Sequence, residues 1–455
     1  MVRLCSAVYQ VYSLIWQLRT DNQGSCVKVV FGSTRQCGYS MRESNSLLKQ
    51  LSSNWRVIVL LLSLLLPLES RLQLKTQFLP EISQRSFWAP LHASLSRQNI
   101  TIRQHLVLFH INHPSAAYII QEYNRSNISL VSEVSILEYE TDILKLEIGR
   151  DYIHSGPSII NSTLFSSWSP SFDHIGLKLS RFLGFDYEYQ LLRLDNRENE
   201  YGSFHRWLYY RRLSYDTGHG VIVGVKDAVL ATGIKRGVDF YYLTPGAIFE
   251  LEQLHNHIGA VENARTNNDN HIIGFDIAFI IQNWGSLYVD GIIDEFQIDA
   301  ADRQDVQDVF GINIGFQKTL KHGSLVVEYF LSSPWLYTNG GQFTNVEYYN
   351  YSIGLRTPQS HGLSLIHVFD GKKWNSDVQI SLYQKGKQDL GIVWDADGNK
   401  IPLYDFSDRV EVEVDARIEF KEYQYLDHFR VCYNLLDQSD LHFMIGFKFS
   451  SIINE

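Results

Sequence analysis

From residue 99 onward, hydrophobic and polar residues alternate in short segments that are separated by turn residues. The clearest segment is 410–420, in which Val, Ala, Ile and Phe take every second position and charged residues take the positions between them. Successive side chains of a β-strand point to opposite faces, so this segment has one apolar and one charged face. Such a strand suits a wall between lipid and a wet lumen, and its length matches the ~9–11 residues of a tilted spanning strand.

The same alternation recurs more weakly in other segments, which are 144–148, 175–180, 221–226 and 378–383. Between such segments stand turn dipeptides that suit hairpins, namely Asn339-Gly340, Asp370-Gly371 and Asp397-Gly398. From residue 71 onward the chain has room for about 18 strands at roughly 20 residues per strand and turn. The pattern therefore predicts an all-β fold, a transmembrane antiparallel β-barrel of roughly 16–18 strands.

Two segments break the alternation and predict short helices in loops. In the first, Thr244 and Pro245 resemble an N-cap and a first helical position, and residues 247–257 would form the helix. The second is 300–310. The strand pattern continues after each segment, so both helices are expected in connections between strands.

The last predicted strand alternates from Leu441 to Phe449, with aromatic or aliphatic residues on one face. A C-terminal strand of this kind resembles the signal that barrel-assembly machinery recognises, so that machinery is an expected partner during biogenesis. Residues 450–455 are expected to form a short tail after this strand.

The amino-terminal region has a different character. Residues 57–66 form a run of ten that is apolar except at Ser63, too short for a transmembrane helix but typical of the ~7–15-residue core of a secretory signal. The alternative is a buried core helix. We expect 1–40 to be a misassigned extension with Met41 as the true start, 41–72 a signal peptide, 73–98 a short N-terminal segment, and 99–455 the barrel.

Composition narrows the function. The net charge of −10 argues against a nucleic-acid partner, which would require a basic surface. Three of the four cysteines lie in the first forty residues, so no disulfide framework is expected in the body of the chain. We expect no cofactor and no metal.

A run of motifs resembles the Wzi family of capsule-assembly outer-membrane barrels over about residues 88–455. The motifs are LEIGRDYIHSGPS (146–158), SPSFDHIGLKLS (169–180), FHRWLYYRRLSYDTGHGVIVGV (204–225), FYYLTPGAIFELEQ (240–253), NNDNHIIGFDIAF (267–279) and GSLYVDGIIDEF (285–296). The resemblance implies a non-enzymatic, lectin-like barrel in the bacterial outer membrane that holds capsular or other surface polysaccharide. It implies no catalytic residues. The best-known member carries a helical bundle inside its barrel, whereas residues 71–100 here show little helical pattern.

Under the lectin hypothesis, aromatic faces stack on sugars and Arg binds acidic groups. Trp335, expected at a loop tip, is the first candidate; the others are Tyr337, Tyr209, Tyr210, Arg211 and Arg212. The structural alternatives are a membrane-interface girdle for the two adjacent tyrosines and lumen charge balance for the two arginines.

Other polar residues give weaker signals. Asp290, Asp294 and Glu295 could suggest a calcium or glycosidase site, but their alternation phase favours solvated lumen charge. The spacing of His255, His257 and His271 matches no zinc motif. His174 lacks an accompanying Gly-x-Ser-x-Gly elbow that would indicate a hydrolase.

Three functions remain open at this stage. The leading hypothesis is the polysaccharide-binding barrel in contact with outer-membrane lipid. The alternative is a porin-like channel for sugars or anions, which the same strands would support. The third is a secreted all-β carbohydrate enzyme whose alternating faces would line a sandwich core.

Overall fold

The computed structural model describes residues 73–78, 81–83, 87–110, 128–244, 249, 268–295, 308–338, 343–388, 390, 406, 410–421, 426–434, 440–447 and 449–454. All of them belong to the compact unit Ser70–Glu455, and the other compact unit is Met1–Glu69. The expected extension 1–40 and signal peptide 41–72 therefore lie outside the described residues.

The described chain is built from β-strands. In chain order these are β1 (Gln73–Phe78), β2 (Glu81–Ser83), β3 (Phe87–Arg97), β4 (Ile100–His110), β5 (Ile128–Glu140), β6 (Leu144–Asp151), β7 (Phe172–Phe182), β8 (Phe185–Arg193), β9 (Arg197–Asn199), β10 (Gly202–Asp216), β11 (Val221–Ile234), β12 (Asn268–Ile281), β13 (Gly285–Glu295), β14 (Val309–Leu320), β15 (Gly323–Ser332), β16 (Glu347–Tyr348), β17 (Tyr351–Ser352), β18 (Ser360–Asp370), β19 (Trp374–Lys385), β20 (Glu411–Phe420), β21 (Leu426–Asn434), β22 (Asp440–Phe447) and β23 (Phe449–Asn454).

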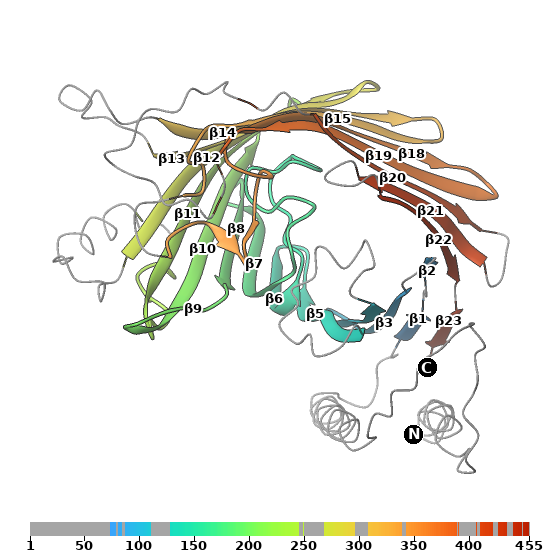
Figure 1. Cartoon of the computed structure of the whole chain (residues 1–455), viewed down its shortest axis with the longest axis horizontal. Helices are drawn as coiled ribbons and strands as arrows, with labels where there is room; N and C mark the ends of the chain where they lie inside the picture. Colours follow the sequence, from blue (N-terminus) through green and yellow to red (C-terminus); the bar gives the residue numbers. More distant parts are fainter. Residues whose placement is uncertain are drawn as a thin grey trace, which may run out of the picture. The chain divides into compact units, whose positions relative to one another are not determined.

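Twenty-one of these strands form one sheet that closes on itself (Figure 1). Closure is made where β1 pairs with both β3 and β23, and where β2 pairs with both β3 and β22. Three consecutive pairs each share one place in the ring: β1 with β2, β8 with β9, and β22 with β23. The described strands thus occupy eighteen positions, and every pairing is antiparallel, which confirms the predicted barrel.

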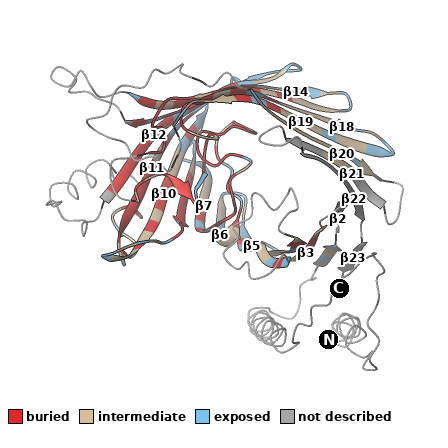
Figure 2. Ribbon diagram, viewed as in Figure 1, coloured by how far each residue is buried: buried red, intermediate tan, exposed pale blue. Residues whose placement is uncertain are grey.

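The alternation in the sequence becomes the two faces of this wall. On β11, Val223 and Val225 are exposed on the outside, whereas Gly224 and Lys226, which alternate with them, are buried inside. Figure 2 shows buried residues gathered on β10, β11 and β12, while β18 and β20 are mostly half-buried. Because outward apolar side chains recur from β3 to β22, the outer wall presents an apolar surface to lipid.

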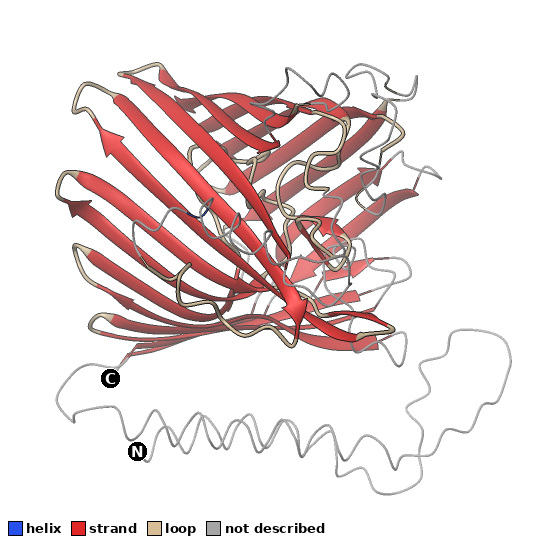
Figure 3. Cartoon of the chain, turned by 90° about the vertical axis from the view of Figure 1, so that its left-hand side faces the viewer, coloured by secondary structure: helices blue, strands red, loops and turns tan. Residues whose placement is uncertain are grey.

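The two ends of the barrel differ in the length of their connections. At one end, strands are joined by short turns such as 183–184, 282–284 and 321–322, and β1 begins and β23 ends there. At the other end, consecutive strands are separated by longer stretches of sequence, which are 111–127, 152–171, 235–267, 296–308, 333–359 and 386–410. Figure 3 shows the short turns along one edge of the barrel. Outer-membrane barrels have short periplasmic turns and longer extracellular loops, so the long-loop end is the extracellular one.

The structure corrects two expected boundaries. The barrel begins at Gln73 and not at residue 99, because β1, β2 and β3 belong to the closed sheet. The expected tail after Phe449 is part of β23 as far as Asn454 and pairs with β1. β1, β2 and β23 are too short to show a clear alternation, whereas β3 has 11 residues and alternates from Leu91 to Ser96.

The two expected loop helices fall mostly outside the described residues. Phe249 is helical, whereas Val309 and Phe310, at the end of the second expected helix, begin β14. In the described part of the chain, no helix combines the length and apolar character needed to cross a bilayer.

A charge placed on the outer wall tests the orientation of the strands. Val225 is 59% exposed and faces outward, so Val225→Arg should lower the free energy of unfolding by about 2–4 kcal/mol in lipid. Val225→Leu serves as the control and should stay close to the parent. The measurement is urea unfolding in vesicles, followed by the heat-modifiable shift in gel mobility. Equal stability of the Arg variant and the parent would show that this face does not meet lipid.

Candidate functional site

Two long connections fold into the barrel from the extracellular end. Residues 152–171 join β6 to β7, and residues 333–359 join β15 to β18. Most of their residues are buried, including Ile160, Phe165 and Leu355 (Figure 2). We call these two segments together the lumen plug.

The carboxylate of Glu328 holds the first segment of the plug. Glu328 lies inside on β15 and is fully buried. It accepts hydrogen bonds from three successive backbone N–H groups, those of Ile159 (2.6 Å), Ile160 (3.1 Å) and Asn161 (2.6 Å). The Tyr288 hydroxyl donates a further bond of 2.7 Å. Successive N–H groups aimed at one anion form a nest, so the charge of Glu328 is compensated without a cation.

Asp290 on β13 makes a second anchor for the same segment. Its carboxylate accepts hydrogen bonds from the hydroxyls of Ser158 (3.0 Å) and Thr163 (2.5 Å). It also forms an ion pair with Lys226 of β11, whose side chain is buried as well. A buried charge is tolerated when it is paired and hydrogen-bonded, and here both conditions are met.

The two segments of the plug are joined by hydrogen bonds. The N–H of Phe165 donates to the carbonyl of Ile353 at 2.7 Å, and Leu164 pairs with Gly354 as an isolated β-bridge. The hydroxyl of Tyr337 donates to the carbonyl of Thr163 at 2.6 Å and accepts from the N–H of Leu355 at 2.8 Å. Burial raises the pKa of Tyr337 well above its usual value, so this hydroxyl stays protonated.

The second segment is also fixed to the wall. Arg206 of β10 has a fully buried side chain and donates to the carbonyl oxygens of Phe343 (3.1 Å) and Asn345. Asp195 balances its charge through a hydrogen bond of 2.7 Å. On β13, the carboxylate of Asp294 accepts the N–H of Tyr337 at 2.6 Å. The plug is therefore tethered to β8–β15 at several depths.

Where the plug meets the extracellular ends of β19 and β20, aromatic and charged side chains from the plug and from these strands come together. The Arg356 guanidinium lies over the rings of Trp168 (4.7 Å) and Tyr383 (4.4 Å). It also makes a bidentate ion pair with Glu413, in which Nη1 and Nη2 donate to the two carboxylate oxygens at 2.9 and 2.6 Å. Lys385 and Glu411 pair at 3.0 Å next to Tyr383. We call Trp168, Arg356, Tyr383, Lys385, Glu411 and Glu413 the vestibule cluster.

The indole N–H of Trp168 is a buried donor in the vestibule cluster. It has no hydrogen-bond partner within the described part of the protein. A buried indole N–H normally finds an acceptor, so this one is suited to a ligand oxygen. Sequence reasoning missed Trp168, although an aromatic residue within the small polar run 166–171 was a visible signal.

The predicted carbohydrate residues are not brought together in one site. Tyr209 and Arg211 lie on the outer face of β10, beneath the segment that follows β11. The Tyr209 hydroxyl accepts from the N–H of Asp239 at 2.6 Å, and Arg211 pairs with Asp227 under the ring of Phe249. Arg211 therefore does not balance lumen charge, and Tyr209 does not belong to an exposed aromatic girdle.

Tyr210 and Arg212 face inward. Tyr210 is fully buried, contacts Ser155 through its hydroxyl at 2.5 Å and packs edge-on to Phe165 at 5.0 Å. Arg212 donates to Asp276 at 2.8 and 2.7 Å, so the charge-balance interpretation holds for this arginine. The girdle interpretation is wrong for Tyr210 because plug residues cover its ring.

Trp335 and Tyr337 belong to the plug. Trp335 is 8% exposed and so is not at an exposed loop tip, and Tyr337 is fully buried. Both have a positive φ, which reverses the chain inside the barrel. Asp290 and Asp294 do face the lumen, as their phase predicted, but plug residues cover them and their charges are not solvated.

His271 and His174 have structural partners, whereas His255 and His257 lie outside the described residues. His271 contacts Asp227, and His174 Nδ1 lies 3.0 Å from the carbonyl oxygen of Phe172. Among the described residues, no three His, Cys, Asp or Glu side chains gather in an arrangement that could hold a metal ion.

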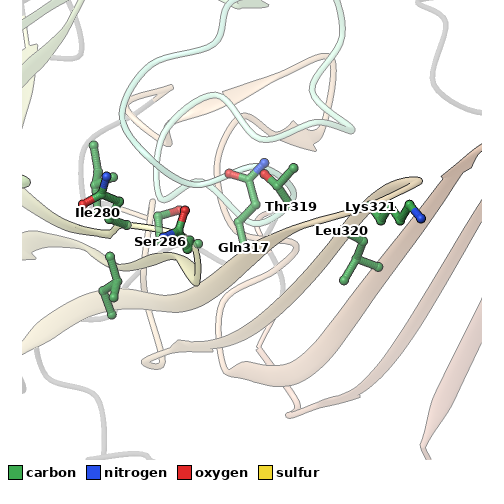
Figure 4. Close-up of a pocket in the computed structure, with 10 residues that line it drawn as sticks. Ile280, Ser286, Gln317, Thr319, Leu320 and Lys321 are labelled. Carbon is green, nitrogen blue, oxygen red and sulfur yellow. The ribbon is translucent and has the colours of Figure 1, made fainter.

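A cavity lies at the opposite, short-turn end. Figure 4 shows this cavity of about 630 Å³, with Ile280, Ser286, Gln317, Thr319, Leu320 and Lys321 around it. Its walls are the hairpins β12–β13 and β14–β15. The lining contains one charged residue and no aromatic ring, so it lacks the stacking surface that the vestibule cluster has.

The ion pair of Lys226 and Asp290 provides a test of the plug. Lys226→Met leaves the Asp290 charge buried without its cation, so the free energy of unfolding should fall by about 3–5 kcal/mol. The control is Lys178→Met, because Lys178 is half-exposed and its pair with Glu188 should contribute about 0–1 kcal/mol. Denaturant unfolding of the refolded barrel measures both. Similar losses in the two variants would contradict the anchoring role of Asp290.

Comparison with known proteins identifies the fold. No protein-family model matches the sequence, and no curated protein matches it. Among solved structures, the barrel is similar to Wzi of Escherichia coli, an outer-membrane protein involved in group 1 capsule assembly and described as a carbohydrate-binding β-barrel. The TM-score is 0.55 with 11% identity, over 83% of this chain and 84% of that one.

Two further solved structures match with lower TM-scores. OccK5 (OpdH) of Pseudomonas aeruginosa has a TM-score of 0.42 and 8% identity, over 84% of this chain and 98% of that one. OccAB4 of Acinetobacter baumannii has 0.41 and 11%, over the same shares. At these identities, structural similarity establishes only a fold. That fold is the outer-membrane β-barrel of Wzi, as the sequence motifs predicted.

Proposed function

We propose that this protein is a non-enzymatic outer-membrane barrel that binds capsular or other surface polysaccharide at the vestibule cluster. The observation that carries the proposal is the buried indole N–H of Trp168, which has no acceptor among the described residues and lies beside Arg356 at the extracellular end. The similarity in fold to a barrel described as carbohydrate-binding supports the same choice.

The chemistry of the cluster suits a sugar chain. An indole ring offers an apolar face to the C–H groups of a pyranose, and its N–H can donate to a ring or hydroxyl oxygen. Glu411 and Glu413 can accept from sugar hydroxyls, while Arg356 and Lys385 can donate to them or to a uronate carboxylate. Both signs of charge are present, which favours a polysaccharide that carries hydroxyl and acidic groups.

The lumen plug supports binding because it fixes the site in advance. Trp168 and Arg356 come from the two different segments of the plug, and hydrogen bonds join those segments. A site held rigid before the ligand arrives loses less conformational entropy on binding. The tethered plug thus offers a reason for folding two long loops inward.

A porin-like channel for sugars or anions remains the second candidate, and a specific observation favours it. The wall from β19 to β21 carries inward charges, among them Glu411, Asp415 and Arg430, of the kind that line a wet lumen.

Glycan binding by a tryptophan variant tests the proposal. Trp168→Ala removes the stacking face and the N–H, so the affinity for capsular polysaccharide should fall at least about tenfold. The measurement is retention of purified barrel on immobilised acidic capsular polysaccharide in detergent.

Trp284→Ala is the matched control, because Trp284 is 66% exposed in a turn at the opposite end. It should bind as the parent does. Loss of binding in both variants would indicate a general defect, and unchanged binding in Trp168→Ala would rule out the vestibule cluster as the site.

Conductance separates the two candidate functions. The plug occupies part of the lumen through anchors on β13 and β15, so the protein in planar bilayers should show little steady ion current. Steady, open pores in the unmodified protein, together with no retention on polysaccharide, would favour the channel.

A further inference from the structure

The outer wall of the barrel carries a row of charged side chains near its extracellular end. Arg150 on β6, Asp173 on β7 and Arg193 on β8 stand directly opposite one another in the sheet. They share the outward face with Ile148 and Ile175, which lie two residues away along their strands and are about half exposed. The row continues to Ser135 on β5 and Trp207 on β10.

The charges in this row are not balanced. Both carboxylate oxygens of Asp173 accept from the Arg150 guanidinium, at 2.6 and 2.7 Å. Arg193 is exposed, and no carboxylate in the described part of the chain pairs with it. The row therefore carries one net positive charge on a wall that faces lipid.

Two other outward arginines on this side of the barrel are paired with carboxylates and covered by other side chains. Arg211 is paired with Asp227, and Arg236 with Asp269. The segment that follows β11 covers both pairs, through Phe249 over Arg211 and Tyr242 against Asp269. Within the described residues, Arg193 has neither a paired carboxylate nor a covering side chain, so its counter-charge can come from the surrounding phase.

An apolar groove runs directly below the row. Ile148, Ile175 and Leu191 form the next row toward the short-turn end, and the register pairs them across the same three strands. With Ser135, Trp207 and the charged row they line a hollow of about 490 Å³. The hollow is thus cationic along its extracellular side and apolar along the side toward the short-turn end.

The depth of the row matches the level of lipid headgroups. Arg193 and Phe185 are the two ends of β8, and Phe185 lies at the short-turn end. Eight steps of ~3.4 Å along a strand tilted by ~35–45° span about 20 Å along the barrel axis. The apolar band of an outer-membrane barrel is ~25 Å tall, so Arg193 lies near its upper boundary, where the headgroups of the outer leaflet begin.

We propose that this hollow is a binding site for a phosphorylated glycolipid of the outer leaflet. Its phosphate would lie outside Asp173, against the guanidinium groups of Arg150 and Arg193 on either side of that residue, with the Ser135 hydroxyl at the edge. Guanidinium groups match phosphate geometry with paired hydrogen bonds, and the interaction is strong at a membrane surface. The acyl chains would run down the groove over Ile148 and Ile175. This inference is independent of the proposed polysaccharide role.

The test compares lipid binding by the parent and by the double variant Arg150→Gln/Arg193→Gln. The probe is a diphosphorylated disaccharide lipid with six acyl chains, added to the detergent-solubilised barrel and counted by native mass spectrometry. The double variant should bind it at least about tenfold more weakly, because the charge-assisted hydrogen bonds are lost.

A control variant removes two cations elsewhere. Lys318→Gln/Lys421→Gln has the same change in net charge, and both lysines lie near the short-turn end. It should bind the lipid as the parent does, and the heat-modifiable gel shift should show all three proteins folded. Retention of the arginine variant on polysaccharide would separate this site from the vestibule cluster.

Three results would overturn the proposal. The first is equal lipid binding by the parent and the arginine variant. The second is equal binding of the dephosphorylated lipid, which would leave the arginines without a role. The third is full displacement of the lipid by millimolar inorganic phosphate, which would assign the site to free phosphate.

Discussion

The interior of this barrel depends on two carboxylates that are buried within its wall. Asp290 and Glu328 are fully buried, and a carboxylate in that position is tolerated only when donors surround it. The first segment of the plug supplies those donors, with three backbone N–H groups for Glu328 and two hydroxyls for Asp290. The carboxylates of the wall require the donors of the plug, and the plug is held in place by those carboxylates. The position of residues 152–171 along the barrel axis is therefore fixed.

This dependence extends to the second segment and to the vestibule cluster. Once residues 152–171 are fixed, their carbonyl and N–H groups give residues 333–359 an edge to pair with, at Phe165 and Gly354. The second segment then carries Arg356 to the ends of β19 and β20, where Glu413 and Tyr383 meet it. The geometry around Trp168 is therefore a consequence of charges buried elsewhere in the lumen.

The fold could be predicted from sequence because its dominant constraint is periodic. Lipid on one side and lumen on the other impose a period of two, and segment 410–420 shows that period directly. The strands in 73–83 and 450–454 were not predicted because they are short and their place in the barrel is set by partners at the other end of the chain.

The site could not be predicted in the same way. Asp290 and Asp294 have the phase of lumen residues, but phase does not tell a solvated carboxylate from one that a distant loop will cover. Trp335 stands between Pro334 and a Gly-rich turn, which is the local composition of an exposed tip. Its burial depends on Asp294 holding the next residues inside, a contact between positions about forty residues apart.

Adjacent arginines show why residue type alone is a weak guide in a barrel. Arg211 and Arg212 are neighbours, yet one is paired outside beneath a loop and the other is paired inside with Asp276. Arg193 lies on the outer face of the next strand, at the level where the apolar band ends. Alternation along the strand decides whether a side chain faces the lumen or the outside. On the outside, its position along the barrel axis decides whether it is surrounded by acyl chains, lipid headgroups or water. No described carboxylate pairs with Arg193, so a cation at this level of the outer face is suited to an anionic group from the membrane.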